Sequence, residues 1–212
     1  MLSLTDKPEN MLEYKGHKFR LNLCYDNVLR FYKLMDDKSL DEWDKVNIAF
    51  KIFFDKDAVA YVLQNDDSEL LVQGVEQVAE YINQKAYGNS GGGSGSLPGR
   101  SFSYVQDAEA IYSSFMQQYG IDLIDEQGSL HWDKFKALLH GLGDKTPFGE
   151  IVHIREMDTA QIEDNAHRQE VEELQDYYAL TDGVSVEEQE QNSNQAADDL
   201  FAAIAGISKK GG

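Results

Sequence analysis

Three side chains on or near one predicted helix are the first candidates for metal binding. His131 and His140 are nine positions apart, with Asp133 between them. That offset does not place both imidazoles on one helix face, and zinc needs three or four converging ligands. The aspartate pairs at 36–37 and 66–67 could attract calcium, but neither lies in a loop with EF-hand ligand spacing. The sequence therefore predicts polar surface residues at these positions and no metal site.

Cys24 is the single cysteine of the chain and the first candidate nucleophile. It lies in a stretch of alternating apolar residues, where a lone cysteine is typically a small buried hydrophobe. The sequence contains no nucleophile-elbow serine motif, no zinc-protease helix motif and no phosphate-binding loop motif. The glycine-rich segment 88–99 has no lysine and no strand-to-helix context, which is typical of a linker. We therefore expect a non-enzymatic protein that uses no cofactor.

An apolar stripe near the C-terminus is the predicted partner-binding site. Its members share one face of a short predicted helix: Leu200, Phe201, Ile204 and Ile207. An isolated helix of this length is marginal in water, so the stripe either docks onto its own domain or binds a partner. The preceding residues 187–195 carry no apolar side chain, which favours the partner. On this interpretation, deletion of residues 187–212 leaves the thermal transition of the core nearly unchanged.

The charge and composition exclude several classes of partner and location. Acidic residues outnumber basic ones 38 to 19, for a net charge of -19, and such a surface repels phosphate. Nucleic acid and anionic membranes are therefore poor partners. No apolar run approaches the ~20 residues of a membrane span, and the first residues lack the apolar core of a signal peptide. A single cysteine is typical of a reducing compartment, so we expect a protein of the cytosol.

The N-terminal half has the pattern of one short strand followed by helices. Alternation from Phe19 to Tyr25 predicts the strand. Asp26, Ser39 and Ser68 are the expected N-caps of three helices. Their apolar stripes are Val28, Phe31, Tyr32 and Met35, then Trp43, Val46, Phe50 and Phe53, then Leu71, Val75, Val78 and Ile82. Gly74 weakens the third helix, since glycine costs a helix about 1 kcal/mol relative to alanine.

The C-terminal half has a clearer helical pattern. One helix ends at Gly120, and the next carries Trp132, Phe135, Leu138 and Leu139 behind a Ser129 cap. Thr146-Pro147 is a helix start signal, because proline at the first helical position loses no hydrogen bond. A capping box at 158–161 predicts the start of a long helix. Between Glu156 and Glu190 there are 12 acidic residues and one basic residue, so that helix is expected to be mostly solvated.

These elements predict an all-α fold with at most one short N-terminal strand. Residues 1–87 form an N-terminal helical subdomain, residues 88–100 a flexible Gly/Ser linker, and residues 101–182 a C-terminal helical subdomain. Residues 183–212 form an acidic, polar tail that contains the apolar stripe. Trp132, Phe135, Leu138 and Leu139 are expected in the core of the second subdomain.

The second half of the chain contains a series of motifs: D-A-x-x-I-Y-x-x-F-x-Q-x-Y-G-I-D-L at 107–123, L-H-W-x-K-F-x-A-L-L-x-G-L at 130–142, T-x-F at 146–148, I-x-x-x-R at 151–155 and Tyr-Tyr-Ala-Leu at 177–180. With these motifs the chain resembles a protein family of tailed bacteriophages that infect Gram-positive hosts, usually called phage gene product fifteen. The N-terminal half agrees more loosely, through Phe19-Arg20 and L-x-x-x-x-K-x-x-x-A-x-x-x-F-F at 40–54. The resemblance covers roughly residues 17–180.

The resemblance implies a function that the composition does not. Proteins of this family are encoded between the major tail protein and the tape-measure protein, which implies a tail-assembly chaperone in the host cytoplasm. The implied partner is the tape-measure protein, with the tail-tube protein as a second candidate. Two alternatives stay open: a structural component of the finished tail, and an acidic decoy that inhibits a host nucleic-acid-binding protein. The family implies no catalytic residue.

Overall fold

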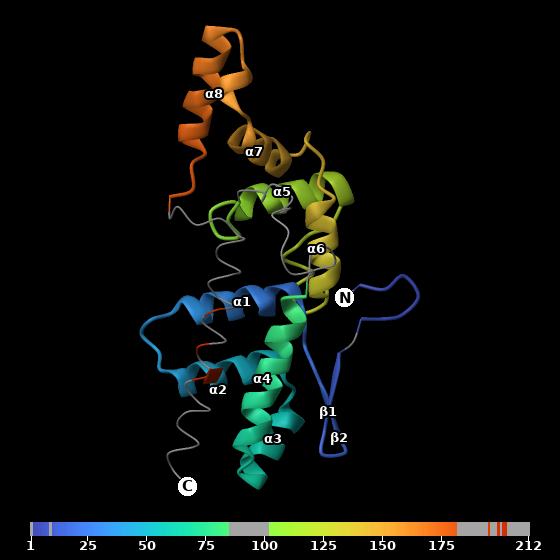
Figure 1. Cartoon of the computed structure of the whole chain (residues 1–212). Coiled ribbons are helices and arrows are strands. Elements are labelled where there is room, and N and C mark those ends of the chain that lie inside the picture. The colour runs from blue at the N-terminus through green and yellow to red at the C-terminus, as the bar shows by residue number, and fades with distance from the viewer. Residues whose placement is uncertain are drawn as a thin grey trace, which may run out of the picture. The chain divides into compact units, whose positions relative to one another are not determined.

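A computed structural model of the chain describes residues 2–8, 10–84 and 102–181, together with Gln195, Asp199, Phe201 and Ala202. These residues form a mainly helical protein, which confirms the predicted fold class (Figure 1). The elements of the first half are β1 (Met11–Tyr14), β2 (His17–Arg20), α1 (Tyr25–Asp36), α2 (Glu42–Phe53), α3 (Lys56–Asn65) and α4 (Ser68–Ile82). Those of the second half are α5 (Ala108–Tyr119), α6 (Trp132–His140), α7 (Pro147–Glu156), the short 3₁₀ helix η1 (Thr159–Gln161) and α8 (Asn165–Tyr177).

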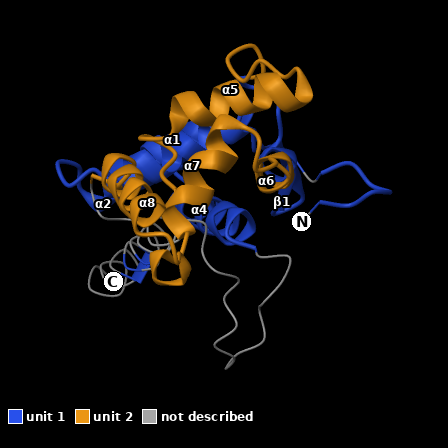
Figure 2. Ribbon diagram, turned by 90° about the horizontal axis from the view of Figure 1, so that it is seen from above, with its two compact units in different colours: residues 1–91, 127–135, 190–212 blue, residues 92–126, 136–189 orange. Residues whose placement is uncertain are grey.

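The chain divides into two compact units (Figure 2). Unit 1 comprises Met1–Gly91, Gln127–Phe135 and Glu190–Gly212, and unit 2 comprises Gly92–Glu126 and Lys136–Gln189. The expected subdomain boundary near residue 100 places Gln127–Phe135 in the second half, whereas the structure groups this segment with the first. Helix α6 therefore begins in unit 1 and ends in unit 2.

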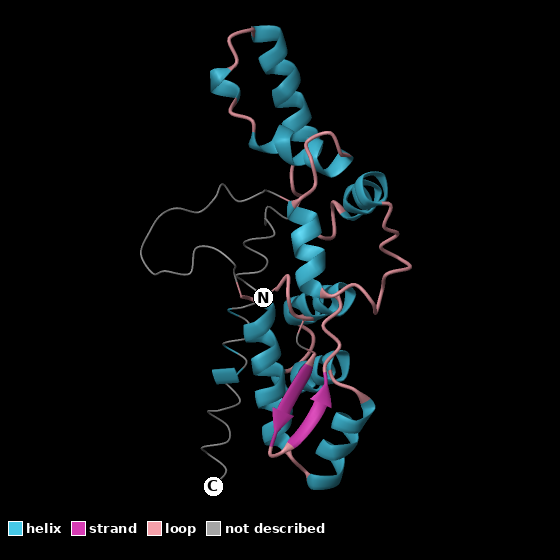
Figure 3. Cartoon of the chain, turned by 90° about the vertical axis from the view of Figure 1, so that its right-hand side faces the viewer, coloured by secondary structure: helices cyan, strands magenta, loops and turns pink. Residues whose placement is uncertain are grey.

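The strands of unit 1 form an antiparallel hairpin, drawn in magenta in Figure 3. Lys15 and Gly16 form its turn with φ of 48° and 79°, the left-handed conformation that a two-residue hairpin turn requires. The hairpin starts earlier than the strand expected from Phe19 to Tyr25. Beyond Arg20 the chain stays extended and makes isolated antiparallel bridges at Leu21 and Cys24 instead of a continuous strand.

The core of unit 1 is built from the predicted apolar stripes of α1, α2 and α4, which are buried except for Trp43. Aromatic side chains dominate this core, and the rings of Phe31 and Phe53 meet edge to face at 5.4 Å. Trp132 and Phe135 belong to the same core. Trp132 meets the Tyr32 ring at 5.9 Å, and Phe135 stacks on Tyr25 at 4.8 Å.

The prediction that Trp132 and Phe135 form the core of the second subdomain is therefore wrong. The indole N–H of Trp132 donates to the Ile82 carbonyl at the end of α4, and the Trp132 backbone N–H donates to Leu23. Both Trp132 and Phe135 are at most 1% exposed. An amphipathic stripe predicts which side chains are buried, but it does not predict which unit they pack against.

Three of the expected helix caps are displaced by one or two positions. Helix α2 is capped by Asp41 and helix α4 by Asp67, where Ser39 and Ser68 were expected. In α2 the Asp41 carboxylate, two residues after Ser39, accepts the Asp44 N–H, and in α4 the Asp67 carboxylate, one residue before Ser68, accepts the Leu70 N–H. Cys24 occupies the N-cap position of α1, and Asp26 instead accepts a hydrogen bond from the Gly128 N–H at 2.9 Å.

Unit 2 is built on helices α5 and α7, with α8 packed against α7. Thr146 caps α7 as predicted, and Gly120 ends α5 with a φ of 66°. Phe148 at the start of α7 is fully buried and donates its backbone N–H to Ser114 of α5. In α8 only Val171 is buried, which confirms that the acidic helix is mostly solvated, although it begins at Asn165 behind an Asp164 cap.

Candidate functional site

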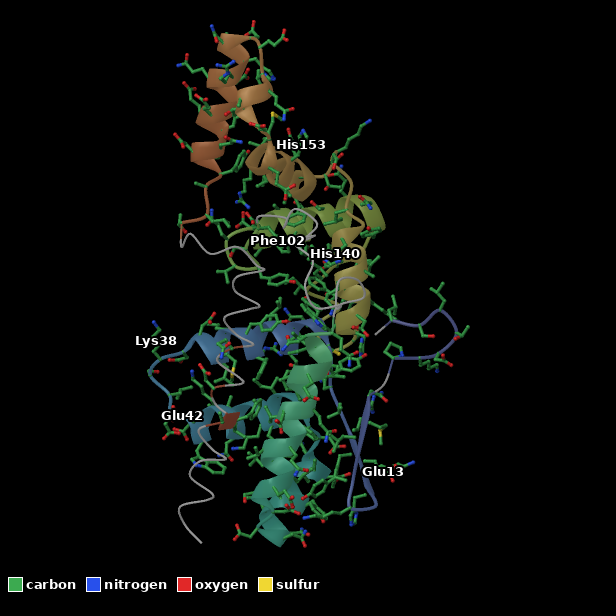
Figure 4. The ribbon with its side chains drawn as sticks, in the orientation of Figure 1. Glu13, Lys38, Glu42, Phe102, His140 and His153 are labelled. Atoms are coloured by element: carbon green, nitrogen blue, oxygen red, sulfur yellow. The ribbon has the colours of Figure 1, made fainter. Side chains whose placement is uncertain are left out.

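The candidate metal ligands have structural partners instead of a common centre. In unit 1 the His131 Nδ1 accepts a hydrogen bond from the Asp133 backbone N–H, and the Asp133 carboxylate accepts one from the Tyr81 hydroxyl at 2.7 Å. His140 and His153 belong to unit 2, where both are exposed (Figure 4). Within the described residues, no three His, Cys, Asp or Glu side chains are placed to hold a metal ion.

Cys24 and His131 face each other across an antiparallel bridge. The Tyr25 N–H donates to the Leu130 carbonyl on one side of this pair, so the two side chains project toward the same face. Burial raises the pKa of the Cys24 thiol, the Asp26 carboxylate raises it further, and Arg20 opposes both effects. Because the thiolate is the nucleophile, this environment favours the unreactive thiol form.

The motif residues of the resemblance meet in unit 2 as a buried ion pair. Arg155, which ends the I-x-x-x-R motif, binds Asp107 at the start of the D-A motif through two hydrogen bonds of 2.7 Å and 2.8 Å. Their side chains are 6% and 4% exposed. Arg155 also donates through Nε to the Tyr178 carbonyl, within the Tyr-Tyr-Ala-Leu element. Residues from three motifs that are far apart in the sequence therefore meet in one set of contacts within unit 2.

Other motif residues have the same structural role. The Tyr119 hydroxyl donates to the Leu138 carbonyl, and the Thr146 hydroxyl caps the Gly149 N–H. In unit 1, Lys45 of the looser motif donates through Nζ to the Met35 carbonyl at 2.7 Å. These contacts join helices to one another. The shared motifs are therefore mainly determinants of folding.

A surface pocket of about 440 Å³ lies in unit 1 around the extended segment that leads from β2 into α1. Four separate stretches of chain line it, through Asn10, residues 20–24, four residues of the stretch 51–55 (all but Phe53) and three of the stretch 128–131 (all but Leu130). Backbone hydrogen bonds hold these stretches together, because Asn22 N–H donates to Phe53 and Leu21 N–H donates to Asn10. The volume falls in the range of pockets that bind small groups.

The pocket combines an apolar wall with polar and cationic groups. Leu21, Leu23, Ile52 and Phe54 are the main apolar contributors, with Cys24 beside them. The polar lining includes Asn10, Arg20, Asn22, Lys51, Asp55, Ser129 and His131. Sequence analysis did not single out Arg20 or Lys51 as site residues. No spacing rule connects them, because the pocket forms only when distant stretches of chain meet.

Large apolar side chains are also exposed at several places on the two units. In unit 1 they are Leu2, Leu4, Met11, Trp43, Ile48 and Leu63; in unit 2 they are Val105, Met116, Ile124 and Tyr177. Leu63, Val105 and Tyr177 are each more than three-quarters exposed. Exposed apolar groups of this size are available for contact with a partner.

The predicted tail site is described only in part. Leu200, Ile204 and Ile207 lie outside the described residues. Phe201 is described, belongs to unit 1 and is only 9% exposed. In the state that the structure describes, the Phe201 ring is therefore covered.

The fold and its contacts define a mainly helical protein whose shared motifs stabilise its two units. A family model described as Bacteriophage Gp15 protein matches residues 4–180. The chain therefore belongs to this family of bacteriophage proteins, as the motif resemblance implied. Comparison with curated proteins and with solved structures gave no match. Of the helices in the described ranges, none combines the length and apolar character needed to cross a membrane.

Proposed function

We propose that this phage protein is a non-enzymatic tail-assembly chaperone that binds the tape-measure protein in the host cytoplasm. The tail-tube subunit is a second candidate partner. The observation that carries the proposal is membership of the Gp15 family over residues 4–180, because the position of the family's genes in the tail block implies a role in tail assembly.

The surface of the chain suits a chaperone of a long helical protein. Apolar side chains such as Leu63 and Val105 are 78% and 76% exposed, and they can cover apolar stripes of a client before the tube encloses it. The net charge of -19 keeps a complex self-repelling and in solution. Since the chaperone must leave during tube polymerisation, modest affinity and fast dissociation suit the role.

The tail stripe also contributes to the proposed partner contact. The sequence pattern predicts that Leu200, Phe201, Ile204 and Ile207 share one apolar face, and a tethered segment of this kind gains order on binding. Because Phe201 is only 9% exposed in the described state, a partner can bind its ring only after the ring is uncovered. Uncovering the Phe201 ring costs free energy. The net affinity for the partner is therefore lower, which again suits transient binding.

Co-expression with the tape-measure protein tests the proposal. We expect the tape-measure protein to stay soluble and to co-purify with the chain. The variants Leu63→Ser and Val105→Ser should reduce capture, whereas Glu80→Ser, a change at another exposed position, on α4, should not. If the tape-measure protein is equally soluble and unbound with or without the chain, the proposal fails. Recovery of the chain from purified virions would instead identify it as a structural tail component.

A further inference from the structure

Two cations line the pocket of unit 1 without a partner of their own. Arg20, at the end of β2, and Lys51, in the last turn of α2, both line the pocket and are both exposed. Within the described residues, neither side chain makes a salt bridge or donates a hydrogen bond.

The charge of the pocket contrasts with that of the chain. Asp55 is the one carboxylate among the lining residues, and it already accepts the Ala58 N–H as the N-cap of α3. Two cations and one occupied carboxylate make the lining net basic on a chain of charge -19. The pocket is therefore electrostatically favourable for a single anionic group. A polyanion, by contrast, is repelled by the acidic surface of the rest of the chain.

Polar and apolar groups beside the cations suit a peptide better than a free ion. The side-chain amides of Asn10 and Asn22 line the pocket and make no hydrogen bond within the described part of the chain. Each amide can both donate to and accept from a peptide backbone. Leu21 and Ile52 supply apolar wall for neighbouring side chains. The planar guanidinium of Arg20 matches a carboxylate in two-point geometry.

We propose that the pocket formed by Asn10, residues 20–24, residues 51–55 and residues 128–131 binds a carboxylate-bearing segment of a partner polypeptide. Arg20 and Lys51 bind the carboxylate, the two asparagine amides bind the adjacent backbone, and the apolar wall takes flanking side chains. The assignment rests on the proposed function in one respect only, that the chain works by binding another protein.

Titration of the full, ¹⁵N-labelled chain with short peptides tests the assignment. The probes are N-acetyl-Leu-Glu-Leu amide, its uncharged analogue N-acetyl-Leu-Gln-Leu amide, and inorganic phosphate. We expect the Glu peptide to shift backbone amide signals of residues 20–24 and 128–131 saturably at millimolar concentration. The Gln peptide and phosphate should each bind at least tenfold more weakly.

Paired charge variants separate the pocket from the overall charge. Arg20→Gln combined with Lys51→Gln should weaken binding of the Glu peptide at least tenfold. Lys38→Gln removes one charge from the exposed loop between α1 and α2 and should change nothing (Figure 4). Unchanged spectra elsewhere verify that each variant is folded.

Three results would overturn the carboxylate assignment: no saturable shift, equal binding of the Gln peptide or phosphate, or full binding by the double variant. Failure here is distinguishable from failure of the chaperone proposal. If the double variant still captures the tape-measure protein, the chaperone role stands and the pocket assignment falls. If the peptide binds but no tape-measure protein is captured, the pocket stands and the chaperone role falls.

Discussion

The Asp107–Arg155 pair is the most consequential single contact in unit 2. Both side chains are almost fully buried, and the arginine also holds the Tyr178 carbonyl at the end of α8. Removal of the arginine leaves the Asp107 carboxylate buried without its partner. We expect Arg155→Met to lower the free energy of unfolding by about 3–5 kcal/mol, measured by urea denaturation.

Two further variants test whether the buried, unpaired charge causes the loss of stability in Arg155→Met. Arg30→Met breaks an i,i+4 pair whose arginine is 54% exposed, and the Asp26 carboxylate keeps the Gly128 N–H as a partner, so the cost should be about 1 kcal/mol. Asp107→Leu combined with Arg155→Met removes both buried charges and should recover part of the loss. If Arg155→Met costs no more than Arg30→Met, the buried pair does not stabilise unit 2.

Cys24 is expected to react slowly with iodoacetamide near neutral pH. Burial and the Asp26 charge raise the pKa of its thiol, so the thiolate is scarce until the pH exceeds the ordinary range for cysteine. The alkylation rate, followed by mass spectrometry, should therefore still be rising above pH 9. Asp26→Asn removes one cause of the raised pKa and should shift the rate profile to lower pH. A rate that is already maximal at pH 7 would contradict this.

At the scale of elements, apolar periodicity predicted the helices well because burial repeats with the helical period. The stripes of α1 and α4, the end of α5 and the start of α7 lie where the pattern placed them. Caps were predicted less well, since several polar residues near one helix start compete for the same N–H groups. The pocket was not predictable, because Arg20 and Lys51 lie far apart in sequence and line one pocket only since the chain pairs Leu21 with Phe54.

Gly74 in α4 is required by close packing, although glycine weakens a helix. An alanine Cβ at this position would lie 2.7 Å from Cζ of Phe54, whose ring stacks on Phe50 at 4.1 Å and has little room to move. Alanine should gain about 1 kcal/mol in helix propensity but lose about 1–3 kcal/mol to overpacking. We expect Gly74→Ala to lower the melting temperature, and Glu80→Ala on the exposed face to leave it nearly unchanged. A stabilised Gly74→Ala variant would contradict this packing.

A cluster of charged side chains joins the hairpin turn to the start of α4. Lys15 lies 3.1 Å from both Asp67 and Glu69, and the Tyr14 hydroxyl donates to Asp67. The Lys15 ammonium lowers the pKa of Glu69. Burial alone would raise the pKa of Asp67, but hydrogen bonds from the Leu70 N–H, Lys15 and Tyr14 together lower it.

This cluster should lose its contribution in acid. A carboxylate whose pKa is lowered by folding stabilises the fold above its ordinary pKa, and that contribution disappears as the pH falls through the lowered value. The difference in melting temperature between the wild type and Lys15→Met should therefore be present in full at pH 6 and should be smaller at pH 3. Lys18→Met, in the longer exposed pair with Glu13, serves as the control with little difference at either pH. A Lys15→Met effect independent of pH would exclude the ion pairs as its cause.

At the scale of the whole molecule, deletion of the tail is expected to change the stability of the protein. The sequence predicted that deletion of residues 187–212 leaves the core transition nearly unchanged, but the burial of Phe201 alters this expectation. Loss of a buried phenylalanine costs about 1.5–3 kcal/mol. We therefore expect the deletion to lower the melting temperature by a few degrees and to weaken capture of the tape-measure protein. Phe201→Ala should reproduce the thermal effect, and an unchanged melting temperature in both would restore the original expectation.

The grouping of Gln127–Phe135 with unit 1 has a consequence for how the protein is made. Nascent chains fold from the N-terminus as they leave the ribosome, domain by domain. Here the first unit has Trp43 from the start but lacks its buried tryptophan, Trp132, until residue 132 has been synthesised, so its aromatic core is incomplete until then. A ribosome stalled just after the glycine-rich segment would hold a first unit without this part of its core. Synthesis of the second unit is thus under way before the first can close.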